Sequence, residues 1–282
     1  MKTAKALSPI IRIAKYTIAD EVLQKSFVIM SAVCAVFVFL TRDCYQGNYM
    51  VNGQLLAAGT VVRVVSHATF HFISAGVMLM AALLAMRVLR RDRSDGMQAC
   101  ILSKPITRWQ YVMGKIIGLW VLSALIMFIL HSIVFFITSI NFQVIMPEYL
   151  IASLLSSLNL FFVVVAVLLL SLLMPDIIAF ICIMGIGVTG LVADGISALS
   201  HSQMAQAMLQ QPGVYQQSGF TGWKIIYYVW PKLSGVQQLA SSLIGNEKFP
   251  GFGSLYPVIN VFLYCLVLGA LLFRRFREED IV

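Results

Sequence analysis

The stretch from Leu150 to Met174, LIASLLSSLNLFFVVVAVLLLSLLM, decides the fold class. It runs for 25 residues without one Asp, Glu, Lys or Arg, and a transmembrane helix needs roughly 20 consecutive apolar residues. A helix that is apolar all round must be surrounded by protein or by lipid. The stretch is therefore predicted to cross a membrane.

Five further apolar runs of about the same length lie before and after it. The six predicted transmembrane helices are Val22–Leu40, Val64–Leu89, Lys115–Ile140, Leu150–Met174, Ile177–Leu199 and Leu255–Phe273. The chain of 282 residues is 60% hydrophobic and 11% charged, whereas average soluble domains are about 45–50% apolar and about 25% charged. The predicted fold class is an all-α integral membrane protein, with residues 1–282 forming a single membrane domain.

The placement of Lys and Arg predicts the orientation of these helices. Fifteen of the 20 precede the first span, lie between or at the ends of spans two and three, or follow the sixth span. The other five are spread over the longer loops of the opposite side. Because cytoplasmic loops carry an excess of Lys and Arg, both termini are predicted to be cytoplasmic. The net charge of +8 thus indicates membrane orientation and contact with lipids, and no nucleic acid is expected as a partner.

A helix is predicted before the first span. Ser8 and Pro9 are typical of a helix start, with Ser as the N-cap and Pro at the first position. One face of this helix would carry Ile11, Ala14, Ile18 and Val22. Two interpretations remain open: a basic amphipathic helix in the inner membrane interface, or a cytoplasmic extension of the first span.

The long outer loop between spans five and six is predicted to contain short helices that dip toward the membrane. In it, Ser234 is expected to cap a helix from Val236 to Ile244, which Gly245 would end.

The cytoplasmic link between spans two and three reads RRDRSDGMQACILSKPITR from Arg90 to Arg108. Its start is charged, and Ala99–Leu102 is apolar. Pro105 keeps the residue before it extended, and Thr107 and Gln110 have the spacing of a capping box, so a new helix is predicted to start there. The link is predicted to be a short helix, a sharp turn and a helix; the alternative is a solvated connector.

This link resembles that of the type-2 ABC transporter permeases. Members of that family have a charged acidic stretch, an apolar stretch, the motif L-S-K-P-I-[ST]-R and then G-K, and this chain has Leu102–Arg108 followed by Gly114-Lys115. Asp92 stands where an acidic residue is expected, whereas Met97 departs from the usual Thr. The order of segments matches along nearly the whole chain, although only the link carries a specific motif.

The resemblance implies the permease subunit of an ABC exporter in a bacterial inner (plasma) membrane. A second permease subunit, either an identical copy or a related chain, would complete a pathway between facing second and fifth spans, and separate ABC ATPase subunits would dock on the link, which is the coupling helix of the family. The expected docking surface combines charges with an exposed apolar patch. Its residues are Asp92, Arg93, Ser94, Asp95, Gly96, Ile101, Leu102, Lys104, Pro105 and Arg108.

The sequence carries no recognisable catalytic motif. The phosphate-binding sequence G-x-x-x-x-G-K-[ST] is absent, because Trp109 stands where its first Gly would be and Ile116 follows Lys115. No H-E-x-x-H or G-x-S-x-G motif occurs either. The chain is therefore predicted to be a transport subunit and not an enzyme, with no cofactor of its own and with ATP and Mg²⁺ bound by the partner ATPase.

A proton-coupled secondary transporter is the alternative function. His67 and His71 would share a face of the second span and Asp194 lies near the outer end of the fifth, so these three are the candidate pathway residues. Such transporters are built from repeated helix patterns, and no such repeat is visible here. Two His would need at least a third ligand to hold a metal ion; none is identifiable, and no metal site is predicted.

Overall fold

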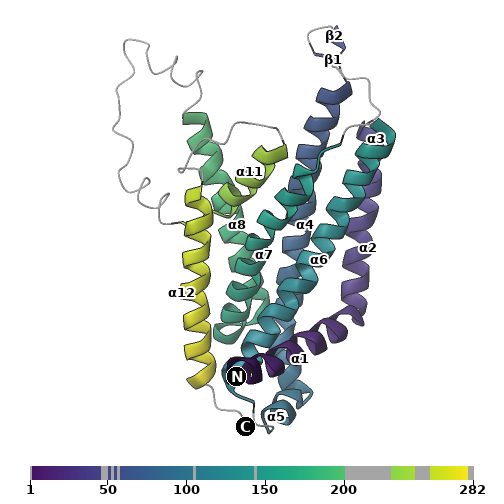
Figure 1. Cartoon of the computed structure of the whole chain (residues 1–282). Helices are drawn as coiled ribbons and strands as arrows, with labels where there is room; N and C mark the ends of the chain where they lie inside the picture. Colours follow the sequence, from purple (N-terminus) through teal and green to yellow (C-terminus); the bar gives the residue numbers. More distant parts are fainter. Residues whose placement is uncertain are drawn as a thin grey trace, which may run out of the picture.

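The computed structural model describes residues 2–45, 50–51, 54–55, 58–103, 106–142, 145–200, 230–244 and 255–278, and these residues are helical apart from short connections and one small hairpin (Figure 1). The hairpin pairs β1 (Met50–Val51) with β2 (Gln54–Leu55) in antiparallel register. The helices are α1 (Lys2–Val22), α2 (Lys25–Leu40), α3 (Arg42–Tyr45), α4 (Ala58–Ser94), α5 (Met97–Leu102), α6 (Arg108–Phe142), α7 (Glu148–Leu173), α8 (Asp176–Ser200), α11 (Leu233–Ile244) and α12 (Tyr256–Glu278).

Among the described residues, five stretches of helix are long and apolar enough to cross a membrane: α2 with α3, α4, α6, α7 and α12. This confirms the predicted all-α, multi-pass membrane class. The helix α8 has 25 residues, which correspond to about 37 Å at 1.5 Å per residue, although the apolar part identified in it covers only Asp176–Gly190. Each of the six predicted spans coincides with one of these helices, and a sixth crossing by α8 stays a prediction.

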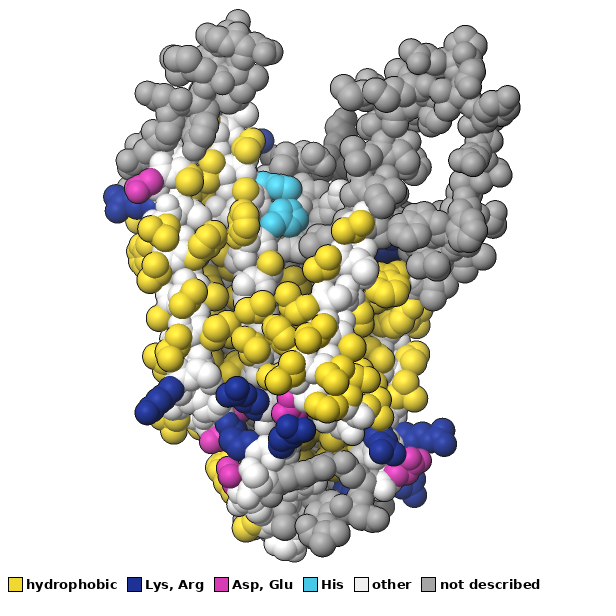
Figure 2. All heavy atoms as spheres, turned by 180° about the vertical axis from the view of Figure 1, so that it is seen from behind, with side chains coloured by type: hydrophobic (Ala, Val, Ile, Leu, Met, Phe, Trp, Pro, Cys, Tyr) yellow, Lys and Arg dark blue, Asp and Glu magenta, His cyan; other side chains and the backbone are white. Residues whose placement is uncertain are grey.

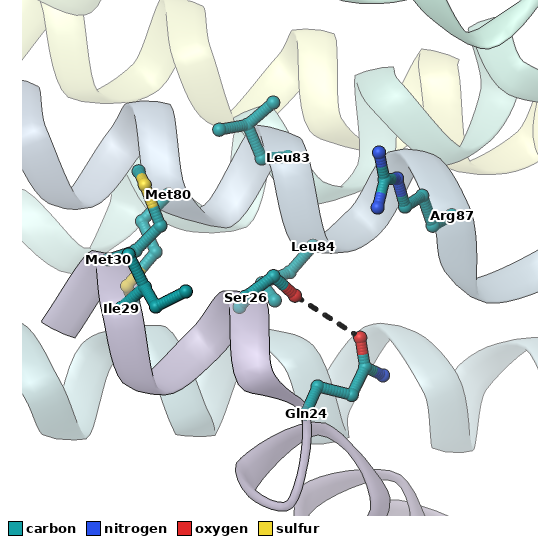
Figure 3. Close-up of a pocket in the computed structure, with 8 residues that line it drawn as sticks. All are labelled: Gln24, Ser26, Ile29, Met30, Met80, Leu83, Leu84 and Arg87. Carbon is teal, nitrogen blue, oxygen red and sulfur yellow. Dashed lines mark hydrogen bonds between the residues drawn. The ribbon is translucent and has the colours of Figure 1, made fainter.

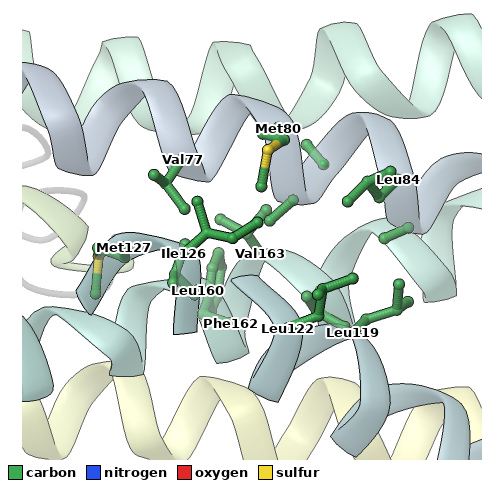
Figure 4. Close-up of a cluster of buried hydrophobic side chains, with 14 of the residues drawn as sticks. Val77, Met80, Leu84, Leu119, Leu122, Ile126, Met127, Leu160, Phe162 and Val163 are labelled. Atoms are coloured by element: carbon green, nitrogen blue, oxygen red, sulfur yellow. The ribbon is translucent and has the colours of Figure 1, made fainter. Parts of the chain in front are cut away.

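The helix α7 is the centre of the bundle, because α4, α6, α8, α11 and α12 all pack against it. Figure 4 shows apolar side chains of α4, α6 and α7 interdigitating, among them Met80, Ile126 and Phe162. Lipid tails are as apolar as these side chains, so close van der Waals packing rather than exclusion of water holds such helices together.

Polar side chains of α7 fix its neighbours. Ser153 Oγ and His131 Nδ1 of α6 lie 2.9 Å apart, and Asn159 Nδ2 donates to the backbone oxygen of Leu233, the first residue of α11, at 2.8 Å. All four residues are buried. An unsatisfied polar group is costly in an apolar interior, so these contacts select the arrangement in which α6 and α11 meet α7.

The short helix predicted in the outer loop is present as α11. It begins at Leu233, so Ser234 lies in its first turn and is not the N-cap that the sequence suggested. Gln237 Nε2 of α11 donates to the backbone oxygen of His71 on α4 at 3.3 Å. Gly245 and most of the rest of this loop lie outside the described residues.

The N-terminal helix begins earlier than predicted. It begins at Lys2, so Pro9 lies inside it; the residues before Pro9 are largely Ala, Lys and Leu, which favour helix. It ends at Val22, and Leu23 and Gln24 separate it from α2. Figure 1 shows α1 running across the end of the bundle at an angle to α2. It is therefore a separate helix and not an extension of the first span.

Two glycines of α6, Gly114 and Gly118, form the surface on which α1 packs, which we call the glycine seat. A Cβ atom at Gly114 would lie 2.6 Å from Cβ of Ile13, and one at Gly118 would lie 2.9 Å from the backbone oxygen of Ala14. Small residues four positions apart allow the backbones of two helices to approach closely. The G-K motif of the link therefore begins a G-x-x-x-G seat, which the sequence analysis did not recognise.

The face that α1 packs against the bundle lies beside the predicted apolar stripe, and the two share Ala14. Of the predicted face, Ala14 is buried and Ile18 is half-buried, but Ile11 and Val22 are exposed. The residues buried between α1 and the bundle are Ile10, Ile13, Ala14, Thr17 and Glu21. The predicted apolar stripe thus lies beside the buried face and stays largely open to the surroundings.

Because α1 packs so closely on these glycines, one added methyl group at this position should destabilise the protein. Gly118→Ala should destabilise the protein by about 1–3 kcal/mol, because the new Cβ would overlap a backbone atom that cannot move away as a side chain can. Gly269→Ala on α12 is the matched control, since a Cβ there meets nothing within 4 Å. Thermal unfolding of the detergent-solubilised proteins measures both effects. A Gly118→Ala protein that melts like the wild type would disprove the seat.

Candidate coupling site at the end of α4

The link between α4 and α6 is helical before and after Lys104-Pro105, as predicted, but the predicted sharp turn at these two residues lies outside the described part of the chain. The predicted first helix is divided in two at Gly96. Its first part is the end of α4, whose last turn closes where Asp95 N–H donates to the backbone oxygen of Arg91 at 2.9 Å. Gly96 follows with φ of 68°, a left-handed conformation that glycine adopts without steric cost. The chain then enters α5, a helix of 6 residues.

The start of α6 is fixed by the predicted capping box. Thr107 N–H donates to Gln110 Oε1 at 3.0 Å, and Gln110 N–H donates back to Thr107 Oγ1 at 3.3 Å. These two bonds satisfy backbone donors that the first turn of a helix leaves without partners. The direction in which α6 leaves the link is therefore determined locally.

Three consecutive residues at the end of α4, Arg90, Arg91 and Asp92, make ion pairs with three different helices. Successive residues of an α-helix point about 100° apart, because one turn contains 3.6 residues. Three charged residues in a row can therefore reach partners on three sides. We call Arg90, Arg91 and Asp92 the charged hub.

The first residue of the hub reaches α8. Arg90 Nη1 lies 2.9 Å from Asp176 Oδ2, and Asp176 is the first residue of α8. A carboxylate in the first turn of a helix is favoured by the helix dipole. The Arg90 side chain is exposed, so this pair contributes little stability but ties α4 to the turn between α7 and α8.

The second residue of the hub reaches α1. Arg91 Nη2 lies 2.8 Å from Glu21 Oε1 and also contacts Asp20 Oδ2. Burial raises the pKa of the Glu21 carboxyl, and the positive charge of Arg91 partly reverses that rise in pKa. The pair therefore holds the end of α1 against α4, close to the turn into α2.

The third residue of the hub reaches α6. Asp92 Oδ2 lies 2.6 Å from Lys115 Nζ and accepts a hydrogen bond from the hydroxyl of Tyr111. Asp92 is 4% exposed and Lys115 is fully buried. The expectation that Asp92 belongs to an exposed docking surface is therefore wrong as to its position, because both charged groups of the motif, the acidic residue and the lysine of G-K, pair with each other inside the bundle.

The end of α12 closes over this pair. The rings of Tyr111 and Phe276 stack at 5.8 Å between centroids with 22° between their planes. Arg108 Nη1 donates to the backbone oxygen of Arg277 at 2.9 Å. Helices α1, α4, α6, α8 and α12 are thus all fastened together within about one turn of the link.

Of the predicted docking residues whose side chains are described, Ile101 is less exposed than expected. Ser94, Asp95, Gly96 and Arg108 are exposed as expected, but Ile101 is half-buried and packs against the core. The side chains of Arg93 and Leu102, and the whole of Lys104 and Pro105, lie outside the described part of the chain. The role of these ten residues in docking stays a prediction.

Trp109 is the exposed aromatic that the sequence analysis did not assign to this surface. Its side chain is 50% exposed, and its ring lies 5.8 Å from that of Phe273 on α12. Exposed Trp residues are frequent anchors of protein interfaces. The one signal in the sequence was its position between the polar residues Arg108 and Gln110.

The candidate pathway residues lie toward the other end of the bundle. The rings of His67 and His71 lie 4.8 Å apart on one face of α4, as predicted, and Figure 2 shows the histidines at the surface above the apolar region. Asp194 belongs to α8, but its side chain is outside the described part. Among the described residues, no group of three or more His, Cys, Asp or Glu could hold a metal ion.

An apolar cavity of about 140 Å³ lies between α4, α7, α8 and α11. Its walls include Met78 of α4, Val163 of α7 and Ile183 of α8, and Gln237 of α11 contributes a polar group. Pockets that hold small molecules usually measure about 300–1,000 Å³. The cavity would therefore have to widen before it could take a substrate of ordinary size.

Because Asp92 and Lys115 pair directly, the effects of substituting both residues on the free energy of unfolding should not be additive. Lys115→Met should destabilise the protein by about 3–5 kcal/mol, because Asp92 would stay buried without a counter-charge. The double variant Asp92→Leu with Lys115→Met should recover most of this loss, since buried pairs are often replaceable by apolar residues. Denaturant unfolding in detergent measures both. A double variant that is as unstable as the sum of the two single variants would contradict a direct pairing.

The comparisons with known proteins agree with this architecture. No curated protein matches the chain. A family model described as ABC-2 family transporter protein matches residues 47–229, which is more than half of the chain and includes the link, the charged hub and the helices from α4 to α8. The chain therefore belongs to the ABC-2 family of transporter proteins and is a multi-pass membrane permease of an ABC transport system.

Proposed function

We propose that this permease couples ATP hydrolysis by separate ATPase subunits to export across a bacterial inner membrane, and that the coupling passes through the charged hub. The observation that carries the proposal is that Arg90, Arg91 and Asp92, the first residues of the link, pair with α8, α1 and α6. A force applied to α5 acts on the end of α4. The hub distributes that force to three helices at once.

The coupling is best described as a rigid-body change. Packed helices are bistable and not continuously deformable, so a small displacement at one end switches the bundle between discrete arrangements. ATP-driven closure of the partner subunits would move α5 and, through the hub, tilt α4 and α8 against each other. The apolar cavity between these two helices would then open, which favours a substrate with a large apolar part.

Family membership favours this proposal over the proton-coupled alternative, because an ABC system draws its energy from an ATPase. In the proposal, residues 1–282 act as one membrane domain, ATP and Mg²⁺ are bound only by the partner, and a second permease subunit, identical or related, completes the pathway. His67, His71 and Asp194 would then line the outer part of that pathway without a role in energy supply.

The proposed topology has six spans, with α8 as the fifth, and cytoplasmic termini. Figure 2 supports this orientation, since most Lys and Arg side chains visible in that view lie at one end of the apolar region, as expected for a cytoplasmic face. The exposed Ile11 and Val22 of α1 suit a helix that lies in the inner interface, with its other face on the glycine seat.

The energy supply can be tested with the tagged permease. Purified from its own membranes, it should bring down an ATPase subunit, and purified without that subunit it should hydrolyse no ATP. Trp109→Ala should reduce ATPase recovery by at least tenfold if Trp109 anchors the interface, and Asp95→Lys should reduce it by up to about fivefold, as expected for a pair at the rim.

Asp43→Lys is the control for recovery, because it makes the same charge change on α3 at the opposite end of the bundle. ATPase recovery should be scored against the amount of permease in each sample. If both Trp109→Ala and Asp95→Lys recover the ATPase fully, docking occurs elsewhere. ATP hydrolysis by the permease purified without the ATPase subunit would refute the proposal that only the partner hydrolyses ATP.

The topology can be tested by labelling single cysteines in intact cells and in inverted membranes. Cysteines at Ser94 and near the C-terminus should react only from the cytoplasmic side, and a cysteine at Gln217 only from the outside, because α8 would separate the two. Labelling of Gln217 from the cytoplasmic side would exclude the six-span arrangement.

A further inference from the structure

A groove of about 280 Å³ separates the first part of α2 from α4. Figure 3 shows its walls, which come from Gln24, Ser26, Ile29 and Met30 on one side and from Met80, Leu83, Leu84 and Arg87 on the other. The residues from α4 are spaced by three or four positions, so they form one stripe of the helix. The groove therefore runs along the two helices.

The two ends of the groove differ in polarity. Ile29, Met30, Met80 and Leu83 line one part, and the polar groups of Gln24, Ser26 and Arg87 lie together at the other end, where Ser26 Oγ donates to Gln24 Oε1 at 3.5 Å (Figure 3). A phospholipid has the same order of chemistry, with an apolar chain below a polar head. The groove thus fits a lipid that stands upright in the leaflet next to the hub.

Arg87 supplies the charge at the polar end. It is exposed, and among the residues that the structure describes no carboxylate lies within ion-pair distance of it. The neighbouring cations Arg90, Arg91 and Lys115, by contrast, each pair with a carboxylate of the protein. Arg87 therefore retains its charge for an external anion, and a guanidinium binds phosphate with two parallel hydrogen bonds.

The protein itself leaves α2 weakly covered. Only 11% of the apolar window of this span is buried, against 61% for α4. Packing between membrane helices depends on filling the space between them. An acyl chain in the groove would provide contacts that α2 and α4 do not make with each other.

We propose that this groove is a binding site for one anionic phospholipid, with its phosphate at Arg87 and an acyl chain along Ile29, Met80 and Leu83. The lipid is a bound component that fastens α2 to α4, distinct from the transported substrate. The site requires that the helices stand in a membrane, and it does not depend on the proposed export function. With the proposed topology, the lipid belongs to the cytoplasmic leaflet.

Native mass spectrometry of the purified full-length permease tests this site directly. Phosphatidylglycerol and phosphatidylcholine with identical acyl chains are titrated in turn. The wild type should retain one phosphatidylglycerol more tightly than phosphatidylcholine. Arg87→Gln should weaken phosphatidylglycerol binding about fivefold, as expected for one cation near the headgroup, and Arg87→Lys should retain most of it. Arg275→Gln, which removes an exposed cation on α12, should leave it unchanged.

Leu83→Trp tests the apolar part, because the larger ring would fill the groove and should displace the lipid while Arg87 is intact. Thermal unfolding confirms that each variant is folded, and phosphatidylglycerol should raise the melting temperature of the wild type more than that of Arg87→Gln. Equal binding of the two lipids, equal losses in Arg87→Gln and Arg275→Gln, or unchanged binding to Leu83→Trp would each overturn the proposal. So would an equal stabilisation by soluble glycerol phosphate, since it would show that no acyl chain takes part.

Discussion

The arrangement of the helix ends around the link depends on one constraint: the carboxylate of Asp92 is buried, and it needs a buried cation. Lys115 meets that need at 2.6 Å, and this fixes the rotation of α4 relative to α6. Once α4 is fixed, Arg90 and Arg91 can point only toward α8 and α1, because helical geometry sets their directions. The charged hub is thus a consequence of a single ion pair and the order of three residues.

Such a pair is a poor source of stability, since the desolvation of two charges offsets most of their attraction. Its better attested use is to select one register among many similar ones. That use suits this bundle, in which many contacts between helices are apolar and do not by themselves specify one register. The glycine seat acts in the same way on α1: Gly114 and Gly118 admit its backbone at one place, and Arg91 holds its end through Glu21.

The sequence was sufficient for the features that depend on local chemistry or on the bilayer. Apolar length located the five helices that are long and apolar enough to cross a membrane, and the capping box at Thr107 and Gln110 formed as its spacing predicts. The sequence was insufficient where the position of a side chain depends on a residue that is distant in the chain. In the sequence Asp92 stands among other charged residues, so it was predicted to lie on the surface. Only the packing of α4 against α6 shows that it is buried and paired with Lys115. In the same way, Ile11 and Val22 form an apolar stripe, but the glycines of α6 select the adjacent face of α1.

Two cations on one side of α4, Arg87 and Arg91, differ in the groups that face them. Arg91 lies four residues after Arg87, so the two share a side of the helix. Arg91 faces the acidic end of α1, and Arg87 faces the start of α2, which offers Gln24 and Ser26 but no carboxylate. The break between α1 and α2 at Leu23 and Gln24 therefore falls opposite a single turn of α4. On one side of that break the carboxylate of Glu21 neutralises Arg91. On the other side, the phosphate of the proposed lipid would neutralise Arg87. A movement of the hub would shift both contacts together, so the groove between α2 and α4 would change shape in step with the end of α4.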